Sequence, residues 1–246
     1  MRFFLAKYKV PWEIIFISPI FSHLLMNGIE GDIKMDEVIF YDNNFIFEQP
    51  EQKYNTHVEL IEGDTFSVAA KYNKPCCLNF ASHRSPGGGY KNHPYPQEEN
   101  LFCRSNLPEL MDNEEVRKYY PLMGRKALFC SSVLVSLDDN LYPLDEEFEV
   151  SVITLPMVNG PRFPDDFGII NDKIERIFYI AAENKVKTLI LGAFGCGCFG
   201  NPPHLIATYF NVFATCDFRG VFENIIYAIP DKESKNYKAF KEIIVD

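Results

Sequence analysis

The amino-acid sequence predicts an α/β fold, and three patterns support this prediction. Short apolar runs alternate along the chain with stretches of helical periodicity. Two of these runs, VLVSL at residues 133–137 and LILGAF at residues 189–194, carry no charge, as expected for strands buried on both faces of a sheet. Two glycine-rich clusters each lie between a predicted strand and a predicted helix, which is where open α/β sheets bind ligands.

The apolar runs predict seven short strands. The predicted strands are Glu37–Tyr41, His57–Ile61, Pro75–Ala81, Ser132–Leu137, Val150–Leu155, Val186–Phe194 and Glu223–Ile229.

The predicted helices rest on the spacing of apolar residues. The clearest covers residues 168–184, where Ile170, Ile174, Ile177, Phe178 and Ala181 fall at i, i+4, i+7, i+8 and i+11. The polar stretch 111–121 predicts a helix or a lid on the surface. The other predicted helices are Thr65–Tyr72, Gln97–Ser105, Pro203–Thr215 and residues 235–245.

The composition is that of one large globular domain. The chain has 246 residues, of which 47% are hydrophobic and 24% are charged, and this excludes disordered, collagen-like and coiled-coil proteins. The formal net charge of −10 argues against sequence-independent binding to a nucleic-acid backbone. We therefore expect a monomer that makes no direct contact with nucleic-acid phosphates and no association with a membrane.

The cysteines indicate a reduced, intracellular protein. They number seven and show no Cys-x-x-Cys spacing, so the pattern predicts neither a disulfide framework nor a zinc site. Thiols stay reduced inside cells. We expect a cytoplasmic location, or a nuclear one in a eukaryote.

Residues 1–35 form an N-terminal extension in this interpretation. The apolar run at residues 10–26 follows a basic start and is similar to a signal peptide. However, Pro11, Glu13 and Pro19 interrupt the run, which is also shorter than the ~20 residues of a membrane helix. The predicted boundaries are 1–35 for the extension and 36–246 for the main domain.

Both glycine clusters suit the binding of a phosphorylated ligand. The first cluster is Ser85–Gly89 and the second is Gly195–Gly200. Such loops surround a phosphate with backbone N–H groups at the beginning of a helix. An acidic protein can bind a diphosphate in this way without basic side chains.

The second cluster also matches G-x-G-x-x-G, the dinucleotide-binding fingerprint. Asp217 lies near the spacing expected for the ribose-binding acid of an NAD-dependent oxidoreductase. Gly200 is followed by Asn201-Pro202-Pro203, however, which begins a helix rather than continuing one. We therefore place an NAD-binding oxidoreductase third among the candidate functions, after the two described below.

The sequence SPGGGYKNHPYPQEENLFCRSNL resembles the signature of microbial-type poly(ADP-ribose) glycohydrolases, a branch of the macrodomain superfamily. Its three glycines are followed, after a short spacer, by Gln97-Glu98-Glu99. Three further stretches resemble family segments in the same order: IEGDTFSVAAK at 61–71, CLNFAS at 77–82 and GAFGCGCFGNPP at 192–203. The similarity covers residues 36–230. It implies a macrodomain, with a three-layer α/β/α architecture and a mixed central sheet.

The resemblance implies that the chain binds ADP-ribose and hydrolyses poly(ADP-ribose) without a cofactor or a metal ion. In the family the first loop lies near the distal ribose, the second gives backbone N–H groups to the diphosphate, and the aromatic residue of the second loop packs on that ribose. Asp64 corresponds to an acid that some macrodomains use to bind adenine, and it is also a natural N-cap. The implied ligand-binding residues are Asn79, Pro86, Gly87, Gly88, Gly89, Gln97, Gly195, Cys196, Gly197, Cys198, Phe199 and Asp64.

The resemblance assigns the chemistry to Glu99, with Glu98 hydrogen-bonding the ribose and orienting the site. Glu99 would protonate the leaving oxygen of the ribose–ribose bond and then deprotonate the attacking water. Burial that raises the pKa of such a residue toward neutrality favours this role. Adjacent helical residues point ~100° apart, so the spacing predicts a single-carboxylate mechanism rather than an opposed pair.

Departures from the family pattern leave alternatives open. Pro96 stands where the family usually has alanine, and the spacer KNHPYP at residues 91–96 contains two prolines, which stiffen the loop expected over the distal ribose. The substrate is therefore either the polymer or a single ADP-ribose on a macromolecule. A non-catalytic ADP-ribose-binding macrodomain is a further alternative, but the intact Gln97-Glu98-Glu99 favours an enzyme.

Overall fold

The computed structural model of the chain describes residues 38–161 and 164–244. The predicted N-terminal extension and its boundary lie outside these ranges. None of the helices within them is both long enough and apolar enough to cross a bilayer. All seven cysteines fall inside these ranges and carry free thiols.

Seven strands form one mixed sheet in the order β1-β4-β5-β3-β6-β7-β2. Strands β2, β7, β6, β3 and β5 run parallel to one another, and β4 and β1 extend the sheet in antiparallel fashion. The strands are β1 (Val38–Tyr41), β2 (His57–Glu62), β3 (Cys76–Phe80), β4 (Ala127–Leu137), β5 (Pro143–Leu155), β6 (Thr188–Leu191) and β7 (Asn224–Ile229).

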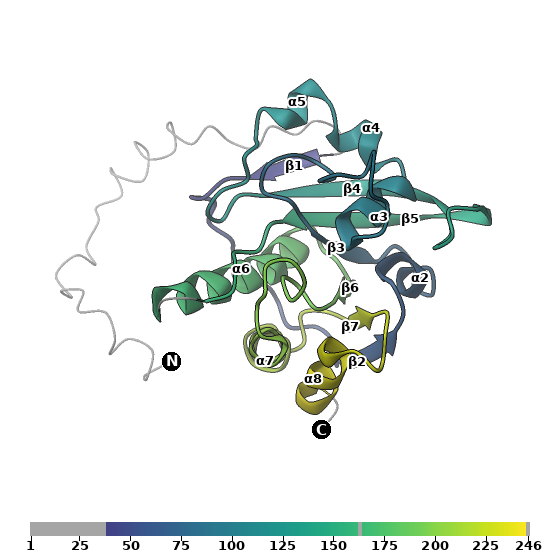
Figure 1. Cartoon of the computed structure of the whole chain (residues 1–246). Helices are drawn as coiled ribbons and strands as arrows, with labels where there is room; N and C mark the ends of the chain where they lie inside the picture. Colours follow the sequence, from purple (N-terminus) through teal and green to yellow (C-terminus); the bar gives the residue numbers. More distant parts are fainter. Residues whose placement is uncertain (1–37, 162–163, 245–246) are drawn as a thin grey trace. The chain divides into compact units, whose positions relative to one another are not determined.

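Helices cover both faces of the sheet, with α2 to α5 on one face and α6 to α8 on the other (Figure 1). The predicted three-layer α/β/α architecture with a mixed sheet is therefore confirmed. The helices are α2 (Thr65–Ala69), α3 (Gln97–Cys103), α4 (Leu107–Met111), α5 (Glu114–Arg117), α6 (Pro164–Glu183), α7 (Pro203–Val212), the π-helix η2 (Phe213–Asp217) and α8 (Lys235–Ile244).

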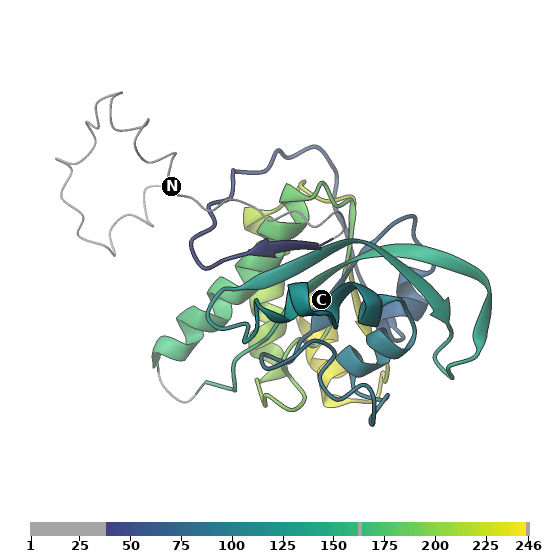
Figure 2. The same ribbon diagram turned by 90° about the horizontal axis from the view of Figure 1, so that it is seen from above.

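All seven predicted strands are present, but two were predicted too short. Strand β4 begins at Ala127 rather than Ser132, and β5 begins at Pro143 rather than Val150. The tip of their hairpin extends past the other strands (Figure 2), so the polar beginning of β5 needs no apolar face. Irregular pairing between Cys130 and Val133 further hides the period-two pattern in the sequence.

Two of the predicted helical stretches are broken up in the structure. The polar stretch 111–121 contains the end of α4 and all of α5, and Asn113 caps α5 by accepting a hydrogen bond from the Val116 N–H. The helix predicted over Pro203–Thr215 ends at Val212 and continues as the π-helix η2.

The apolar stripe of α6 forms the centre of the larger core. Ile170, Ile174, Ile177 and Ala181 are completely buried, as the helical spacing predicted. Phe178 is buried with them, and its ring packs against four other rings. These belong to Phe210, Phe213, Phe218 and Phe222.

The carboxyl ends of the five parallel strands meet at one edge of the sheet. Both glycine clusters lie there, because Ser85–Gly89 follows β3 and Gly195–Gly200 follows β6. The turn at Gly63 and Asp64 follows β2 at the same edge. Ligands of open α/β sheets bind beyond this edge.

Replacing Phe178 with alanine tests the packing of α6. The ring fills a fully buried aromatic cluster, so we expect Phe178→Ala to lower the free energy of unfolding by about 3–5 kcal/mol. Urea denaturation measures this change. Ile169→Ala on the same helix is the control, since that side chain is 44% exposed, and its effect should stay within about 0.5 kcal/mol. A loss as small for Phe178→Ala as for the control would contradict the packing described above.

Candidate active site

A cavity of about 560 Å³ lies at the carboxyl edge of the sheet. Its walls come from the ends of β2, β3 and β7, the loop after β6, and the beginnings of α2, α3 and α8. Asp64, Gln97 and Gly197, three of the residues predicted to bind a ligand, line it. This volume suits a small-molecule ligand.

The carboxyl group of Glu98 holds the first glycine loop. Its Oε2 accepts a 2.6 Å hydrogen bond from the Ser82 N–H, and its Oε1 accepts a 3.1 Å hydrogen bond from the Gly87 N–H. The side chain is almost completely buried. These two bonds fix both ends of the turn before the glycines, and the contact of Glu98 with the ribose stays a prediction.

Burial raises the pKa of Glu98 to about 8. The nearby charge of Glu99 adds to the rise, whereas the hydrogen bonds from Ser82, Asn79 and Gly87 favour the charged form and oppose it. This burial arises because the first turn of α3 directs Glu98 into the protein.

Glu99 lies beside the triple-glycine loop and is partly exposed. Its Oε1 accepts a 3.0 Å hydrogen bond from the Gly89 N–H, and its Oε2 accepts none from the described residues. Gly88 has a positive φ of 54°, and a Cβ atom built on it would lie 2.6 Å from Glu99 Oε1. Only glycine can therefore occupy this position without displacing the Glu99 carboxylate.

Asn79 and Gln97 support the site from within. Asn79 is completely buried and donates hydrogen bonds from its Nδ2 to Glu98 Oε1 and to Thr154 Oγ1, while its Oδ1 has no partner among the described residues. Its contact with the ribose stays a prediction. Gln97 accepts a hydrogen bond from the Phe80 N–H and donates to the Leu78 carbonyl. These bonds join the end of β3 to the beginning of α3.

The second glycine loop presents free N–H groups, with one correction to the prediction. The Cys196 N–H donates to the Ala193 carbonyl, and the Cys196 side chain is buried, so this residue supports the turn. The N–H groups of Gly197, Cys198 and Phe199 donate to no carbonyl of the described residues. These three amides remain available to an anionic ligand.

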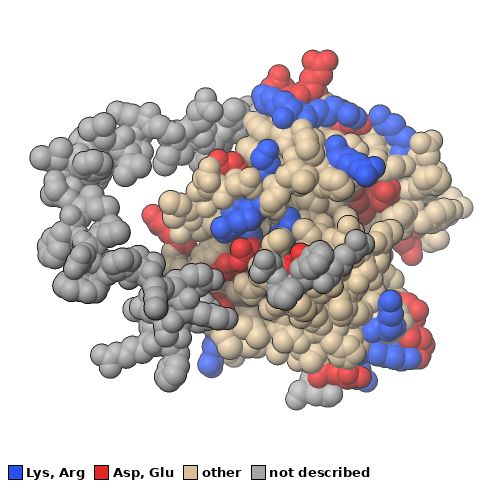
Figure 3. Space-filling model, turned by 60° about the vertical axis from the view of Figure 1, so that its left-hand side comes forward, with Lys and Arg blue, Asp and Glu red and all other residues tan. Residues whose placement is uncertain are grey.

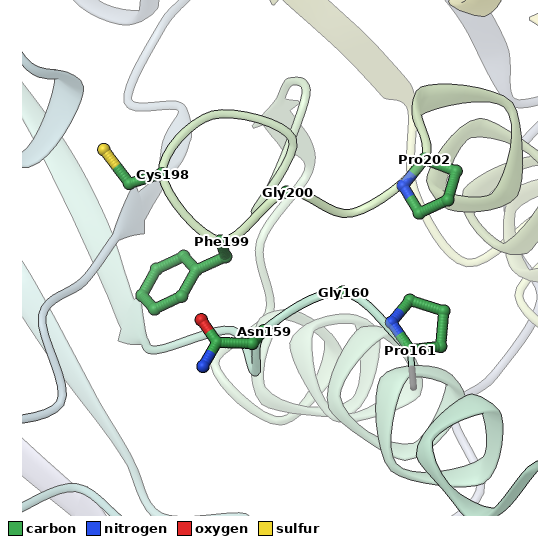
Figure 4. Close-up of a pocket in the computed structure, with 7 residues that line it drawn as sticks. All are labelled: Asn159, Gly160, Pro161, Cys198, Phe199, Gly200 and Pro202. Carbon is green, nitrogen blue, oxygen red and sulfur yellow. The ribbon is translucent and has the colours of Figure 1, made fainter. Parts of the chain in front are cut away.

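The loop after β5 fixes the second glycine loop from outside. Asn201 donates hydrogen bonds to the Val158 and Gly195 carbonyls, and the Gly160 N–H donates to the Phe199 carbonyl. A shallower hollow of about 350 Å³ lies between the two loops, lined in part by Asn159 and Phe199 (Figure 4). Phe199 thus faces this hollow and does not line the larger cavity.

Asp64 is the N-cap of α2, as predicted. Its Oδ1 accepts hydrogen bonds from the Phe66 and Ser67 N–H groups and a 2.5 Å hydrogen bond from the buried Arg104 guanidinium. Burial alone would raise the pKa of Asp64, but the hydrogen bond to Ser67 and the charge of Arg104 outweigh it and hold the pKa below its usual value. Asp64 is therefore a paired carboxylate with a structural role.

Comparison with known proteins agrees with this arrangement. The sequence model of the microbial-type PARG catalytic domain matches residues 30–135. The poly(ADP-ribose) glycohydrolase from Deinococcus radiodurans, solved in complex with ADP-ribose, is 27% identical over 78% of this chain and 85% of that chain, with a TM-score of 0.72. The enzyme from Thermomonospora curvata, solved with the inhibitor ADP-HPD, is 25% identical over 76% of this chain and 78% of that chain, with a TM-score of 0.69. No curated protein matches the chain.

The chain is similar to microbial-type poly(ADP-ribose) glycohydrolases in both sequence and fold. The resemblance inferred from the two glycine clusters and the Gln-Glu-Glu motif is thereby confirmed. The oxidoreductase interpretation loses its support, because Asp217 is exposed and lies at the end of η2, away from the cavity. Gly200 is also exposed, where the third fingerprint glycine would pack against a strand.

Basic side chains gather over α4 and α5 (Figure 3). Most of them have acidic partners: Lys91 and Arg117 both bind Asp112, and Lys118 binds Glu115. Such pairs leave little net positive charge. The expectation that the chain makes no direct contact with nucleic-acid phosphates is therefore unchanged by this surface.

The sequence analysis missed three residues near the cavity. Tyr95 and Asn236 line it, and the charge of Lys235 acts on the Cys196 thiol in the second glycine loop. Lys235 and Asn236 begin α8, which was predicted only as a C-terminal helix. The polar start of that helix, directly after the end of β7, was the signal that could have placed them at the ligand edge.

The buried Glu98 makes the stability of the fold depend on pH. Its pKa is about 8 in the folded state against an ordinary 4.5, so the folded protein holds a proton that the unfolded chain releases between these values. The stabilisation that this bound proton gives is complete below about pH 4.5 and is lost as the pH rises to about 8. We expect Glu98→Gln to remove this part of the decline in unfolding free energy, measured by urea denaturation at several pH values.

The exposed Glu109→Gln in α4 is the control and should leave the decline unchanged. The same pH dependence in Glu98→Gln as in the wild type would show that Glu98 does not carry the shift.

Proposed function

We propose that the chain is a poly(ADP-ribose) glycohydrolase that hydrolyses ribose–ribose O-glycosidic bonds and releases ADP-ribose, with Glu99 as general acid and base. The observation that carries the proposal is the position of the Glu99 carboxylate. It is fixed by the Gly89 N–H next to a triple-glycine loop, at the sheet edge that also holds the cavity and the free amides of the second loop. We assign the catalytic domain to residues 36–246.

The ligand would bind along the carboxyl edge of the sheet. The free N–H groups of Gly197, Cys198 and Phe199 would donate to the diphosphate, and the 560 Å³ cavity would hold the adenosine half. The distal ribose would then lie between the two glycine loops, within reach of Glu99. A similar enzyme is known in complex with ADP-ribose, which supports this class of ligand.

Glu99 would move one proton in each half of the reaction. Its protonated carboxyl group gives a proton to the oxygen that joins the two riboses, and the C–O bond breaks to leave an oxocarbenium-like carbon. The carboxylate then takes a proton from the water that attacks this carbon, which restores the acid. Since Oε1 accepts the Gly89 N–H, Oε2 is the atom that carries the proton.

The protein would act as a single-carboxylate catalyst. Glu98 is buried and held by the Ser82 and Gly87 amides, so it is not placed as a second carboxylate on the opposite face of the sugar. The described residues contain no group of three His, Cys, Asp or Glu side chains placed to hold a metal ion. We further propose that the enzyme is a cytoplasmic monomer that makes no contact with nucleic-acid phosphates.

An assay with auto-modified poly(ADP-ribose) tests this function. We expect the wild-type chain to release free ADP-ribose and Glu99→Gln to reduce the rate at least about 100-fold, the lower range for loss of a general acid and base. Calorimetry should show that Glu99→Gln still binds ADP-ribose. Glu109→Gln, an exposed change on α4, should retain full activity.

The alternatives predict different results in the same assay. A reader of ADP-ribose would bind the ligand without turnover by the wild type. An enzyme for single ADP-ribose units would leave the polymer intact but would remove ADP-ribose from a mono-ADP-ribosylated protein in a manner that depends on Glu99. Release that is equally fast in Glu99→Gln would contradict the assigned role of this residue.

A further inference from the structure

Tyr90 directly follows the triple glycine and is fixed through both its backbone and its ring. Its N–H donates a 3.0 Å hydrogen bond to the Gly87 carbonyl. Its ring packs on that of Phe102 in α3, with 5.3 Å between the ring centroids. Because Gly89 is its neighbour in the chain, the position of Tyr90 sets the position of the Gly89 N–H that binds Glu99.

The hydroxyl group of Tyr90 is held by Asp112, which comes directly after α4. It donates a 3.0 Å hydrogen bond to Asp112 Oδ2. The same carboxylate binds the Lys91 ammonium, also at 3.0 Å, and the Arg117 guanidinium of α5. Only 6% of the Asp112 side chain is exposed, and the segment that carries it lies beside α3 on one face of the sheet (Figure 1). Asp112 thus joins α4 and α5 to the residues that follow the triple glycine.

Among these contacts, the hydrogen bond to Tyr90 is the one that acts on the loop. The side chains of Lys91 and Arg117 are 65% and 50% exposed, and ion pairs at such exposure contribute little to stability. Tyr90 is instead packed on α3 through its ring, so a bond to its hydroxyl restrains the backbone next to Gly89.

Both partners keep the protonation state that this hydrogen bond needs. Burial alone would raise the pKa of Asp112, but the hydrogen bonds from Lys91, Tyr90 and Arg117 outweigh it and hold the pKa below its usual value. Burial and the hydrogen bond to Asp112 raise the pKa of Tyr90, so the phenol retains the proton that it donates at neutral pH. A hydrogen bond to a charged acceptor is stronger than one between neutral groups.

We propose that Asp112 is a positioning residue for the reaction assigned to Glu99. It acts through the Tyr90 hydroxyl, which holds the end of the triple-glycine loop. The Gly89 N–H of that loop in turn holds the Glu99 carboxylate. Displacing a reacting group by about 1 Å can lower a rate about 100-fold. The inference rests on the proposed function, because it names residues that set the position of its catalytic group.

Removing only the Tyr90 hydroxyl tests this role. Tyr90→Phe keeps the ring on Phe102 but loses the hydrogen bond, so we expect ADP-ribose release at saturating poly(ADP-ribose) to slow at least about tenfold. Calorimetry should give an unchanged dissociation constant for ADP-ribose, because the cavity and the second glycine loop are not altered. Tyr119→Phe is the matched control and should keep the full rate, since the buried Tyr119 hydroxyl has no hydrogen-bond partner.

Asp112→Ala removes the acceptor of the same hydrogen bond and should slow release by a similar factor. If Asp112 acts through Tyr90, the double variant Tyr90→Phe/Asp112→Ala should be no slower than Asp112→Ala alone, because both changes remove one interaction. Asp112→Asn keeps an oxygen that can accept from the hydroxyl and should restore part of the rate. Glu115→Gln breaks the exposed pair with Lys118 on α5 and is the control for the loss of a charge.

The outcomes separate this inference from the proposed function. If the wild-type chain releases no ADP-ribose, the function fails and the positioning role fails with it. If the wild type is active but Tyr90→Phe is as fast as Tyr119→Phe, the function stands and Asp112 does not position Glu99. Additive losses in the double variant would show that Asp112 acts independently of Tyr90. A slower rate with an equal loss of ADP-ribose affinity would assign the pair to binding instead of positioning.

Discussion

The buried carboxyl group of Glu98 connects the elements on which the whole candidate site depends. It accepts the N–H groups of Ser82 and Gly87 and so ties the beginning of α3 to the turn that leaves β3. This turn delivers Gly88 and Gly89 next to the same helix. Because those contacts are made by backbone amides, the sequence of the loop matters mainly through Gly87 and Gly88, whose positive φ values other residues rarely adopt.

Helix geometry gives two adjacent glutamates different environments. Residues next to each other in a helix point ~100° apart, so Glu98 enters the protein while Glu99 remains beside the loop at the surface of the site. Burial favours the neutral form of Glu98, and this limits the negative charge close to Glu99. In the proposed reaction the second carboxylate would exchange protons with the substrate, while the first holds the loop that positions it.

The sequence predicted the architecture well because its signals are local. Apolar runs gave all seven strands, and the spacing of Ile170 to Ala181 gave α6. Which site residues are buried was not predictable, since it depends on contacts between distant segments: Asn79 lies beneath Glu98, and the Cys196 amide closes its own turn. Tyr95 and Asn236 were missed for the same reason, because the loop before α3 and the beginning of α8 line one cavity only once the sheet is assembled.

The two ends of the site are formed by different kinds of group, the backbone at one end and side chains at the other. At the β3 end, the glycine loop and Glu99 are held by backbone hydrogen bonds and by a glycine with no room for a side chain. At the β2 and β7 end, the cavity is lined by side chains such as Tyr95 and Asn236. Substitutions there alter what binds without moving the loops. On the proposed function, the affinity for the ligand could therefore vary independently of the proton transfer assigned to Glu99.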